Sequence, residues 1–365
     1  MDFSRLQTPA LILDADRLQA NAEMMLEHCK SKGVFLRPHL KTTKSVEAAK
    51  IATGGRMDGV TVSTLAEAEL FAAAGFDNIL YAVGITPNKF GKLAQIYDGT
   101  GKTIVLTLDS IVMAQAVVDG GLNNPVLIEI DCGESRGGMP ADDADLLEIA
   151  RILGGNFLGI MSHAGHSYGT DQIAQVKKIA QAEIGAAVAA ADKIRAAGMA
   201  VCVVSIGSTP TVLHAEDFSG ITEVRAGIYM LYDLCQYGRN ICELDDIAMT
   251  VLATVIGHNR GAGLLTVDAG ALALSKDIGA NNYLPEAKFG WLCDINTLAP
   301  LNLAVDVVHQ EHGSVKVTDP EVYERLPIGS MVRILPGHAC LTAAGGYGEF
   351  HLLDGRVWAR CDGWF

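Results

Sequence analysis

Apolar residues in the first two thirds of the chain alternate between short runs and longer stretches with helical spacing. The short runs predict eight strands, at residues 34–38, 58–62, 79–83, 103–108, 125–131, 157–162, 200–205 and 222–225. Helical patterns fill most of the intervals, and the longest covers residues 171–197 and ends at Gly198. Eight strand and helix units in succession predict an α/β fold, and they favour a closed (β/α)8 TIM-like barrel over an open doubly wound sheet.

Two of the predicted helices carry a signal for their first turn. Thr64 and Glu67 have the spacing of a capping box ahead of residues 68–74. Thr170 is placed to cap the long helix. The start of the chain predicts one further strand, at residues 8–14, and one further helix, at residues 15–32.

The pattern changes near residue 245, where short apolar runs follow one another without helical stretches between them. These runs predict strands at residues 249–255, 263–267, 303–308, 314–317, 330–335 and 350–353. Residues 277–296 form a long connection without a regular pattern, and such connections are more often functional or mobile than simple spacers. The last third of the chain is therefore expected to form a separate β domain.

Composition and charge narrow the class of protein. The 365 residues are 49% hydrophobic, which is enough for a large core, and no apolar run reaches the roughly 18 residues of a membrane span. The net charge of −14 leaves no basic stripe for phosphates, so we expect no nucleic-acid partner. The eight cysteines have no CxxC spacing, and most are expected to be reduced core thiols. The first residues lack a signal-sequence pattern, so we expect a soluble cytoplasmic protein without a membrane partner.

In a barrel of this kind, functional residues follow the carboxyl ends of the strands. Lys41 follows the first strand, and a lysine in a cleft has a lowered pKa, which frees its amine to form a Schiff base with a carbonyl cofactor. A solvated loop lysine is the ordinary alternative, and Lys44 competes for the same role. The other strand ends bring further candidates, which are Arg136, His163, His166, Tyr168 and Arg225.

Two glycine-containing segments follow the seventh and eighth strands, where barrels commonly bind a phosphate group. They provide Gly207, Ser208 and Thr209 in one loop and Gly227, Ile228 and Tyr229 in the other. Hydroxyl groups and the N–H groups that glycine leaves unobstructed can donate to phosphate oxygens, although Gly-Ser-Thr-Pro is also an ordinary turn. A phosphate site together with a reactive lysine describes pyridoxal 5'-phosphate.

Three motifs together resemble one family. They are Arg37-Pro38-His39-Leu40-Lys41-Thr42, Gly207-Ser208-Thr209-Pro210-Thr211 and Pro336-Gly337-His338-Ala339-Cys340. The chain is similar to the barrel-type pyridoxal-phosphate enzymes of the alanine racemase class, and within that class to the D-serine dehydratase and D-threonine aldolase family. The resemblance implies a (β/α)8 barrel at residues 15–240, an antiparallel β domain made of residues 1–14 and 241–365, and a homodimer whose partner helps to close the site.

His338 and Cys340 are the candidate metal ligands. Residues i and i+2 of an extended chain point the same way, so an imidazole and a thiolate could hold one ion between them. A lone His-x-Cys usually has no function, but two protein ligands would leave positions for water and substrate, as a catalytic zinc requires. The resemblance implies a divalent ion beside the cofactor, Zn2+ with Mn2+ as the alternative, that binds the β-hydroxyl and carboxylate of an amino-acid substrate.

Two arginines have roles that the resemblance suggests but the sequence leaves open. Arg225 stands where alanine racemases carry an arginine facing the pyridine nitrogen, and an always-charged donor there would weaken the ring as an electron sink. An ion pair with Glu223 is the alternative. Arg136 is expected to bind oxygen atoms of the cofactor or substrate, or to pair with Asp131 instead.

The histidines and tyrosines of the strand ends also have two interpretations each. His163 and His166 can stack on the cofactor ring or act as acid or base, because an unperturbed imidazole titrates near neutral pH. A structural histidine is the alternative for one of them. Tyr168 and Tyr229 line the cleft or simply pack.

We therefore expect a metal-assisted lyase that converts D-serine or D-threo-3-hydroxyaspartate into a keto acid and ammonia. Lys41 would carry the cofactor and then remove the α-proton, while the metal draws off the β-hydroxyl. The alternative is a D-threonine-type aldolase, in which His163 or His166 takes the hydroxyl proton. Cys340 favours the dehydratase, because the aldolases more often have aspartate there. An amino-acid racemase and a non-catalytic pyridoxal-phosphate carrier are further alternatives, and the metal pair argues against both.

Overall fold

The protein is described by a computed structural model that covers residues 2–361 together with 363 and 364. The chain divides into two compact units, one formed by residues 22–229 and the other by residues 2–21 with 230–361. In the described part of the chain, no helix combines the length and the apolar character that a membrane span needs.

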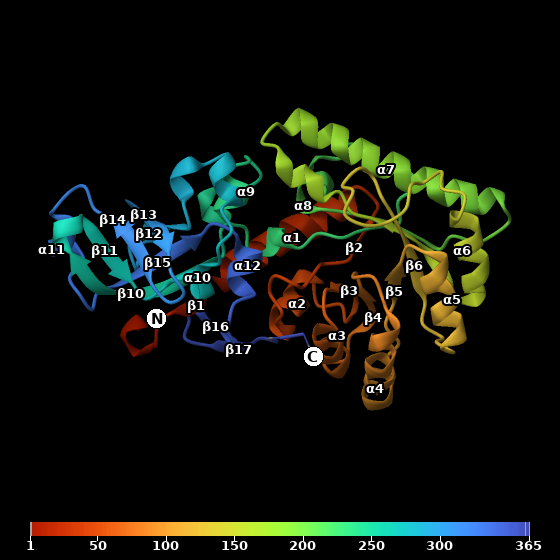
Figure 1. Ribbon diagram of the computed structural model, residues 1–365, viewed down its shortest axis with the longest axis horizontal. Helices are drawn as coiled ribbons and strands as arrows, with labels where there is room; N and C mark the ends of the chain where they lie inside the picture. Colours follow the sequence, from red (N-terminus) through yellow and green to blue (C-terminus); the bar gives the residue numbers. More distant parts are fainter. Residues whose placement is uncertain (1, 362, 365) are drawn as a thin grey trace. The chain divides into compact units, whose positions relative to one another are not determined.

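The unit of residues 22–229 is built on eight strands that pair in parallel. They are β2 (Phe35–Leu36), β3 (Asp58–Val62), β4 (Asp77–Tyr81), β5 (Leu106–Leu108), β6 (Val126–Ile130), β7 (Phe157–Ser162), β8 (Val203–Ile206) and β9 (Glu223–Val224); β2 to β6 are labelled in Figure 1. Each strand overlaps one of the eight apolar runs from which strands were predicted.

The pairings between these strands run in a closed circuit. Six strands form a sheet in the order β2-β9-β8-β7-β6-β5, and β3 pairs with β4. Two parallel bridges join the two sets, one between His39 and Thr61 and one between Leu80 and Val105. Leu80, Val105, Leu127 and Met161 from neighbouring strands are buried together in one hydrophobic cluster. The circuit therefore has an apolar core and brings all eight carboxyl ends to one rim.

Helices alternate with these strands along the chain. They are α1 (Ala15–Ser31), α2 (Val46–Ala52), α3 (Leu65–Ala73), α4 (Phe90–Thr100), α5 (Ile111–Asp119), α6 (Leu146–Leu153), α7 (Ile173–Ala196) and α8 (Thr209–His214). The predicted capping box at α3 is only half formed, because Thr64 accepts the N–H of Glu67 while the Glu67 carboxylate accepts the N–H of Ser63. The predicted cap of α7 is wrong: the hydroxyl of Thr170 accepts the N–H of Gln172, one residue before the helix begins.

The second unit contains a closed antiparallel barrel of six strands. These are β10 (Met249–Asn259), β11 (Leu264–Val267), β12 (Gly290–Cys293), β13 (Pro300–Val308), β14 (Gly313–Lys316) and β15 (Met331–Pro336). The barrel closes because β10 pairs with both β11 and β15. Figure 1 shows β1 (Ala10–Leu13) beside β10 and β16 (Glu349–Leu352), and β17 (Val357–Ala359) pairs with β16. The amino-terminal strand is thus part of the carboxyl-terminal sheet.

Several elements of this unit differ from the expectation. Strand β12 lies inside the segment predicted to be irregular, and β17 was not predicted. Four short helices also occur, α9 (Leu234–Tyr237), α10 (Ala271–Leu274), α11 (Val322–Arg325) and α12 (Ala339–Ala343). Strand β12 is held on both sides, by β13 and β15. Its four residues therefore owe their conformation to distant partners more than to a local pattern.

The eight cysteines all lie among the described residues and form no disulfide. Four of them are buried, namely Cys29, Cys235, Cys242 and Cys293. Burial raises the pKa of the Cys29 thiol to about 12 and that of Cys235 to about 11. These two thiols are therefore protonated at neutral pH and serve as core side chains.

Candidate active site

Lys41 stands at the carboxyl end of the first strand of the eight-stranded circuit. The chain before it is held from both sides, because the N–H of His39 donates to the carbonyl of Ala226 (2.7 Å) and the N–H of Leu40 donates to the carbonyl of Thr61 (2.8 Å). The Lys41 side chain itself is exposed. The competing Lys44 is mostly buried, with its amine 3.6 Å from the Glu67 carboxylate. A rigid backbone that ends in an exposed amine suits covalent attachment of a cofactor at Lys41.

A buried ion pair lies just ahead of Lys41 in the sequence. The guanidinium of Arg37 donates to both carboxylate oxygens of Glu223, at 2.8 and 2.9 Å. The alternative partner for Arg225 is therefore already engaged. Arg225 instead donates to the hydroxyl of Ser205 at 2.6 Å and to the carbonyl of Ser162 at 2.5 Å. Burial lowers the pKa of Arg225 below its ordinary value, but a guanidinium keeps its charge throughout the physiological range.

His163 is held in one tautomer. Its Nδ1 is hydrogen-bonded to the carbonyl of Gly207, which can only accept, so the proton is on Nδ1 and Nε2 has the free lone pair. Burial, together with the charge of Arg225, lowers the pKa of His163 to about 3. The pKa of His39 is also far below its usual range because of burial and the charges of Lys41 and Arg225. These interactions bring Lys41, His39, His163 and Arg225 into one electrostatic cluster with two neutral imidazoles.

Two further candidates of this unit, His166 and Arg136, lie in the loops after β7 and β6. The Nδ1 atom of His166 is buried and has no hydrogen-bond partner within the described structure. Arg136 is exposed and lies 3.5 Å from the Glu134 carboxylate and 3.8 Å from that of Glu129. The suggested pair with Asp131 is wrong, because that carboxylate accepts the N–H groups of Gly133 and Ser135.

The loop after β8 is shaped by close backbone contacts. Gly207 has a φ of +145°, and a Cβ atom there would lie 2.1 Å from the carbonyl oxygen of Arg225. The loop after β9 also approaches the Lys41 segment closely, since a Cβ atom on Gly227 would lie 2.8 Å from the carbonyl oxygen of His39. Only glycine fits at these two positions without a shift of the backbone.

The sequence predicted free N–H groups in the β8 loop, but in the structure these groups are already hydrogen-bonded. That of Gly207 donates to the Glu183 carboxylate (2.9 Å), and that of Ser208 donates to the Thr211 hydroxyl (3.2 Å). The N–H of Thr209 donates to the phenol oxygen of Tyr168 at 3.3 Å. The Thr209 hydroxyl, by contrast, is buried without a hydrogen-bond partner in the described structure. A phosphate oxygen would satisfy this hydroxyl, so the loop fits a phosphate group through its side chain more directly than through its first N–H groups.

Ile228 and Tyr229 complete the second predicted loop. They lie in a short 3-10 helix, Ile228–Met230, directly after Gly227. Both side chains are buried, and that of Tyr229 is fully buried. The interpretation that Tyr229 packs in the core is therefore compatible with its position, and its side chain is not part of an open cleft.

The sequence did not predict any role for Glu183 in the site. It lies in the middle of α7, its side chain is fully buried, and it accepts hydrogen bonds from two loops of the cluster. Burial raises its pKa to about 7, against hydrogen bonds from Gly207 and Thr211 that lower it. The one available signal was an acidic residue among the apolar positions of a long helix, and this signal does not specify a partner.

His338 and Cys340 occupy the beginning of helix α12 in the other unit. The expectation of an extended chain at both residues is wrong: His338 is the residue before the helix, and Cys340 is in its first turn. The carboxylate of Asp233 accepts the N–H of Ala339 at 2.8 Å and so satisfies one of the free N–H groups at the helix start. The two side chains nevertheless meet, and a hydrogen bond joins the His338 imidazole to Cys340.

Asp277 orients the His338 ring. Its carboxylate is hydrogen-bonded to His338 Nδ1, which leaves Nε2 for another ligand. Although burial lowers the pKa of His338, the bonds to Asp277 and Cys340 raise it to about 11. A carboxylate behind a histidine is the usual support of a metal-bound imidazole. His338 Nε2 and Cys340 Sγ would be the two protein ligands of such an ion. Within the described ranges, no group of three or more His, Cys, Asp or Glu side chains is placed to hold one.

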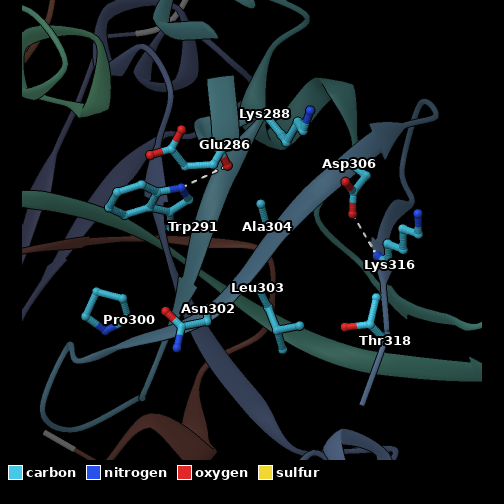
Figure 2. Close-up of a pocket in the computed structure, with 10 residues that line it drawn as sticks. All are labelled: Glu286, Lys288, Trp291, Pro300, Asn302, Leu303, Ala304, Asp306, Lys316 and Thr318. Carbon is cyan, nitrogen blue, oxygen red and sulfur yellow. Dashed lines mark hydrogen bonds between the residues drawn. The ribbon is translucent and has the colours of Figure 1, made fainter. Parts of the chain in front are cut away.

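The β unit also has a surface pocket, which is not lined by His338, Cys340 or Asp277. It has a volume of about 500 Å³ and is lined by residues of and around β12, β13 and β14. Figure 2 shows the Trp291 side chain on one wall, where its ring N–H donates to the carbonyl of Glu286 at 3.0 Å. On another wall, the Asp306 carboxylate points to the backbone of Lys316 and accepts its N–H at 2.7 Å. The pocket contains none of the residues that the sequence predicts for the active site.

Comparison with known proteins identifies the family. The alanine racemase N-terminal domain model matches residues 13–234, and a serine dehydratase domain model matches residues 248–351. The D-threo-3-hydroxyaspartate dehydratase of a Delftia species is 40% identical over 98% of both chains. The D-serine dehydratase of Dictyostelium discoideum is 33% identical, covering 97% of this chain and 95% of the relative. A D-threonine aldolase from an Arthrobacter species is 30% identical, covering 98% and 90%.

A solved structure extends this similarity to three dimensions. It is a cysteine-to-alanine mutant of D-threo-3-hydroxyaspartate dehydratase in a metal-free form, with a TM-score of 0.93 and 38% identity over 99% of both chains. The similarity covers both units of the present chain, and several relatives exceed 30% identity over nearly the whole length. The chain belongs to the family of the D-serine dehydratases and D-threonine aldolases, with an amino-terminal domain of the alanine racemase type.

Proposed function

We propose that this protein is a pyridoxal-phosphate- and metal-dependent lyase that acts on a D-3-hydroxy amino acid, D-serine or D-threo-3-hydroxyaspartate. The observation that carries the proposal is the His338 and Cys340 pair with Asp277 behind the imidazole. Lys41, with its exposed amine at a strand end, supports the use of pyridoxal phosphate. The family relationship supports both the cofactor and the reaction class.

Residues of the eight-stranded unit would bind the cofactor and move the α-proton. When bound, pyridoxal phosphate supplies an electron sink that stabilises negative charge at the α-carbon of an amino acid. Lys41 would hold the cofactor covalently, and its amine, once released by the incoming amino acid, would take the α-proton. The Thr209 hydroxyl would donate to the phosphate. Arg225 would keep the pyridine nitrogen unprotonated by donating to it.

Residues of the β unit would assist loss of the hydroxyl group. His338 Nε2 and Cys340 Sγ would hold an ion, which would supply Lewis acidity toward the β-hydroxyl of the substrate. A thiolate and an imidazole favour Zn2+ over Mn2+. Net loss of water across Cα and Cβ of the substrate, followed by hydrolysis of its C–N bond after release from the cofactor, would give the keto acid and ammonia. Asp277 accepts the hydrogen bond from Nδ1, so Nε2 is the ring nitrogen that would bind the ion once it loses its proton.

A D-threonine-type aldolase is the second candidate. It requires a base for the hydroxyl proton, and a histidine with a pKa of about 3, as for His163, is a weak base near neutral pH. His166, whose Nδ1 is buried without a partner in the described structure, is therefore the candidate base. Cys340 in place of the aspartate found more often in aldolases favours the dehydratase. A racemase or a non-catalytic carrier would have no use for the metal pair.

The proposal extends to the barrel type, the domain bounds and the oligomeric state of the protein. The circuit of eight parallel pairings supports a (β/α)8 TIM-like barrel for the cofactor-binding part, with predicted bounds 15–240. The predicted β domain is made of residues 1–14 and 241–365. We infer a cytoplasmic homodimer, by analogy with the family, and its mass in solution can be measured by light scattering.

Product identification tests the proposed function. The purified protein, supplied with pyridoxal phosphate and zinc, is incubated separately with D-serine, D-threonine and D-threo-3-hydroxyaspartate, and the L-enantiomers serve as controls. A dehydratase gives a keto acid and ammonia in equal amounts. Glycine with an aldehyde would identify the aldolase, and unchanged amino acid in every reaction would contradict both.

A further inference from the structure

The buried carboxylate of Glu183 is the meeting point of two loops in the cofactor-binding unit. Its Oε1 accepts the N–H of Ala164 at 3.0 Å and the N–H of Gly207 at 2.9 Å. Its Oε2 accepts the Thr211 hydroxyl at 2.9 Å. Glu183 comes from α7, whereas these three partners follow β7 and β8. One side chain therefore fixes three points on two loops.

The contacts of Glu183 continue into the loop that carries the predicted phosphate ligands. The Thr211 hydroxyl also accepts the N–H of Ser208 (3.2 Å) and lies 3.0 Å from the Ser208 hydroxyl. The Ser208 hydroxyl in turn is 2.8 Å from that of Ser167 in the other loop. Glu183 is thus linked through Thr211 to a hydrogen-bond network that holds the residues on both sides of Thr209.

Burying the Glu183 carboxylate lowers the free energy of unfolding, so its presence in α7 calls for a structural explanation. Removing a carboxylate from water carries a large desolvation penalty, which three hydrogen bonds offset only in part. An apolar residue of similar size would fill the same space in α7 without that penalty. What an apolar residue could not do is accept the N–H groups of Ala164 and Gly207 together and so hold the two loops at a fixed separation.

We propose that Glu183 is a positioning residue for the cofactor phosphate: it holds the 207–211 loop against the 163–165 loop so that Thr209 meets the phosphate group. This inference rests on the proposed use of pyridoxal phosphate. Glu183 does not itself reach the cofactor, because its two oxygens are engaged by Ala164, Gly207 and Thr211. Its effect should therefore be felt through the phosphate and much less through the aldehyde that Lys41 binds.

The test compares two ligands that differ only in the phosphate. The full-length protein is freed of cofactor and titrated with pyridoxal 5'-phosphate and with pyridoxal, and binding is followed by absorbance. For Glu183→Ala, the dissociation constant of the phosphorylated ligand should rise by about tenfold or more, as expected for the loss of hydrogen bonds to a charged group. That of pyridoxal should change by less than about twofold. A general loss of structure would weaken both ligands alike.

Three further variants make the result independent of a folding defect. Glu183→Gln keeps an acceptor for the two N–H groups and should restore most of the affinity. Thr211→Val removes only the hydroxyl link to Ser208 and should show a smaller, phosphate-specific loss, which decides the question if Glu183→Ala does not fold. Asp192→Asn alters an exposed acid of the same helix, which pairs with Arg195 at 3.1 Å, and should leave both affinities unchanged.

The outcomes separate this inference from the proposed function. If the wild type binds pyridoxal phosphate but the ratio of the two dissociation constants is the same in Glu183→Ala, Thr211→Val and wild type, the positioning role is refuted and the function stands. If the wild type fails to bind pyridoxal phosphate through Lys41, the proposed function fails and this inference fails with it.

Discussion

Replacing Glu223 by glutamine should strongly destabilise the unit of residues 22–229. The Glu223 and Arg37 side chains are 7% and 3% exposed, and the guanidinium donates to both carboxylate oxygens at 2.8 and 2.9 Å. Arg37 also donates to the carbonyl of Asn78 at 2.5 Å, and the Ser205 hydroxyl donates to Glu223 at 2.8 Å. The pair thus links the strands β2, β8 and β9 and the start of β4. In Glu223→Gln the arginine keeps its charge while its buried partner becomes neutral.

The expected loss follows from this burial. Removing one member of a buried ion pair costs about 3–5 kcal/mol of unfolding free energy, because the other charge is left without compensation. In a domain of roughly 200 residues, 1 kcal/mol lowers the thermal midpoint by about 2–4 °C, so the midpoint should fall by about 6–20 °C. Because Arg37 lies four residues before Lys41, the loss should also weaken retention of the cofactor.

The assay is urea denaturation followed by circular dichroism, with cofactor and protein concentrations held constant. The matched control is Arg136→Gln: this arginine also faces two carboxylates, but it is 57% exposed and the distances are 3.5 and 3.8 Å. Its replacement should cost less than about 1 kcal/mol. The double change Arg37→Met with Glu223→Leu should cost less than Glu223→Gln alone, since no buried charge remains. A Glu223→Gln protein as stable as the Arg136→Gln control would refute the reasoning.

The remaining predictions concern the cofactor and the pH dependence. Borohydride reduction should fix the cofactor on Lys41, and a pyridoxyl group mapped to Lys44 would overturn that assignment. Gly227→Val should reduce cofactor affinity more than Ser208→Ala, because its Cβ would lie 2.8 Å from a backbone oxygen of the Lys41 segment; equal affinities by absorbance titration would argue against it. The pKa of His163 is about 3 in the folded protein but 6.5 in the unfolded chain, so the unfolded chain takes up the proton first. Stability should therefore fall as the pH drops from 6.5 toward 3. His163→Gln should reduce the slope of this part of a urea-midpoint profile, and the contribution of His39, whose pKa is also lowered, should remain. The same slope in both proteins would contradict it.

The sequence predicted the features that depend on local pattern. All eight parallel strands fall on apolar runs, and Lys41 could be placed at a strand end because strand and loop are adjacent in the chain. The family motifs also pointed to His338 and Cys340 before any geometry was known. These features depend on residues that are close in sequence, where apolar periodicity and motif spacing carry information.

The features that the sequence did not predict depend on distant partners. Glu183 meets Ala164 and Gly207, which lie 19 and 24 residues away, and nothing in an isolated helix specifies such contacts. Asp277 lies 61 residues before His338, in the segment expected to be irregular. Cys340 lies in the helix α12, whose first N–H is accepted by Asp233, more than 100 residues upstream. Tertiary contacts of this kind override the local pattern.

The most direct test of the account is keto-acid formation by the metal-free protein. The holoprotein is treated with a chelator until elemental analysis finds no metal, and D-threo-3-hydroxyaspartate and D-serine are then added. Two protein ligands make an open site, so the ion should leave while the fold and the absorbance of the bound cofactor remain. We predict that keto-acid formation is lost, that zinc restores it, and that Cys340→Ala behaves like the chelated protein. Keto acid formed at an unchanged rate by protein shown to be metal-free would contradict both the metal's role and the mechanism built on His338 and Cys340.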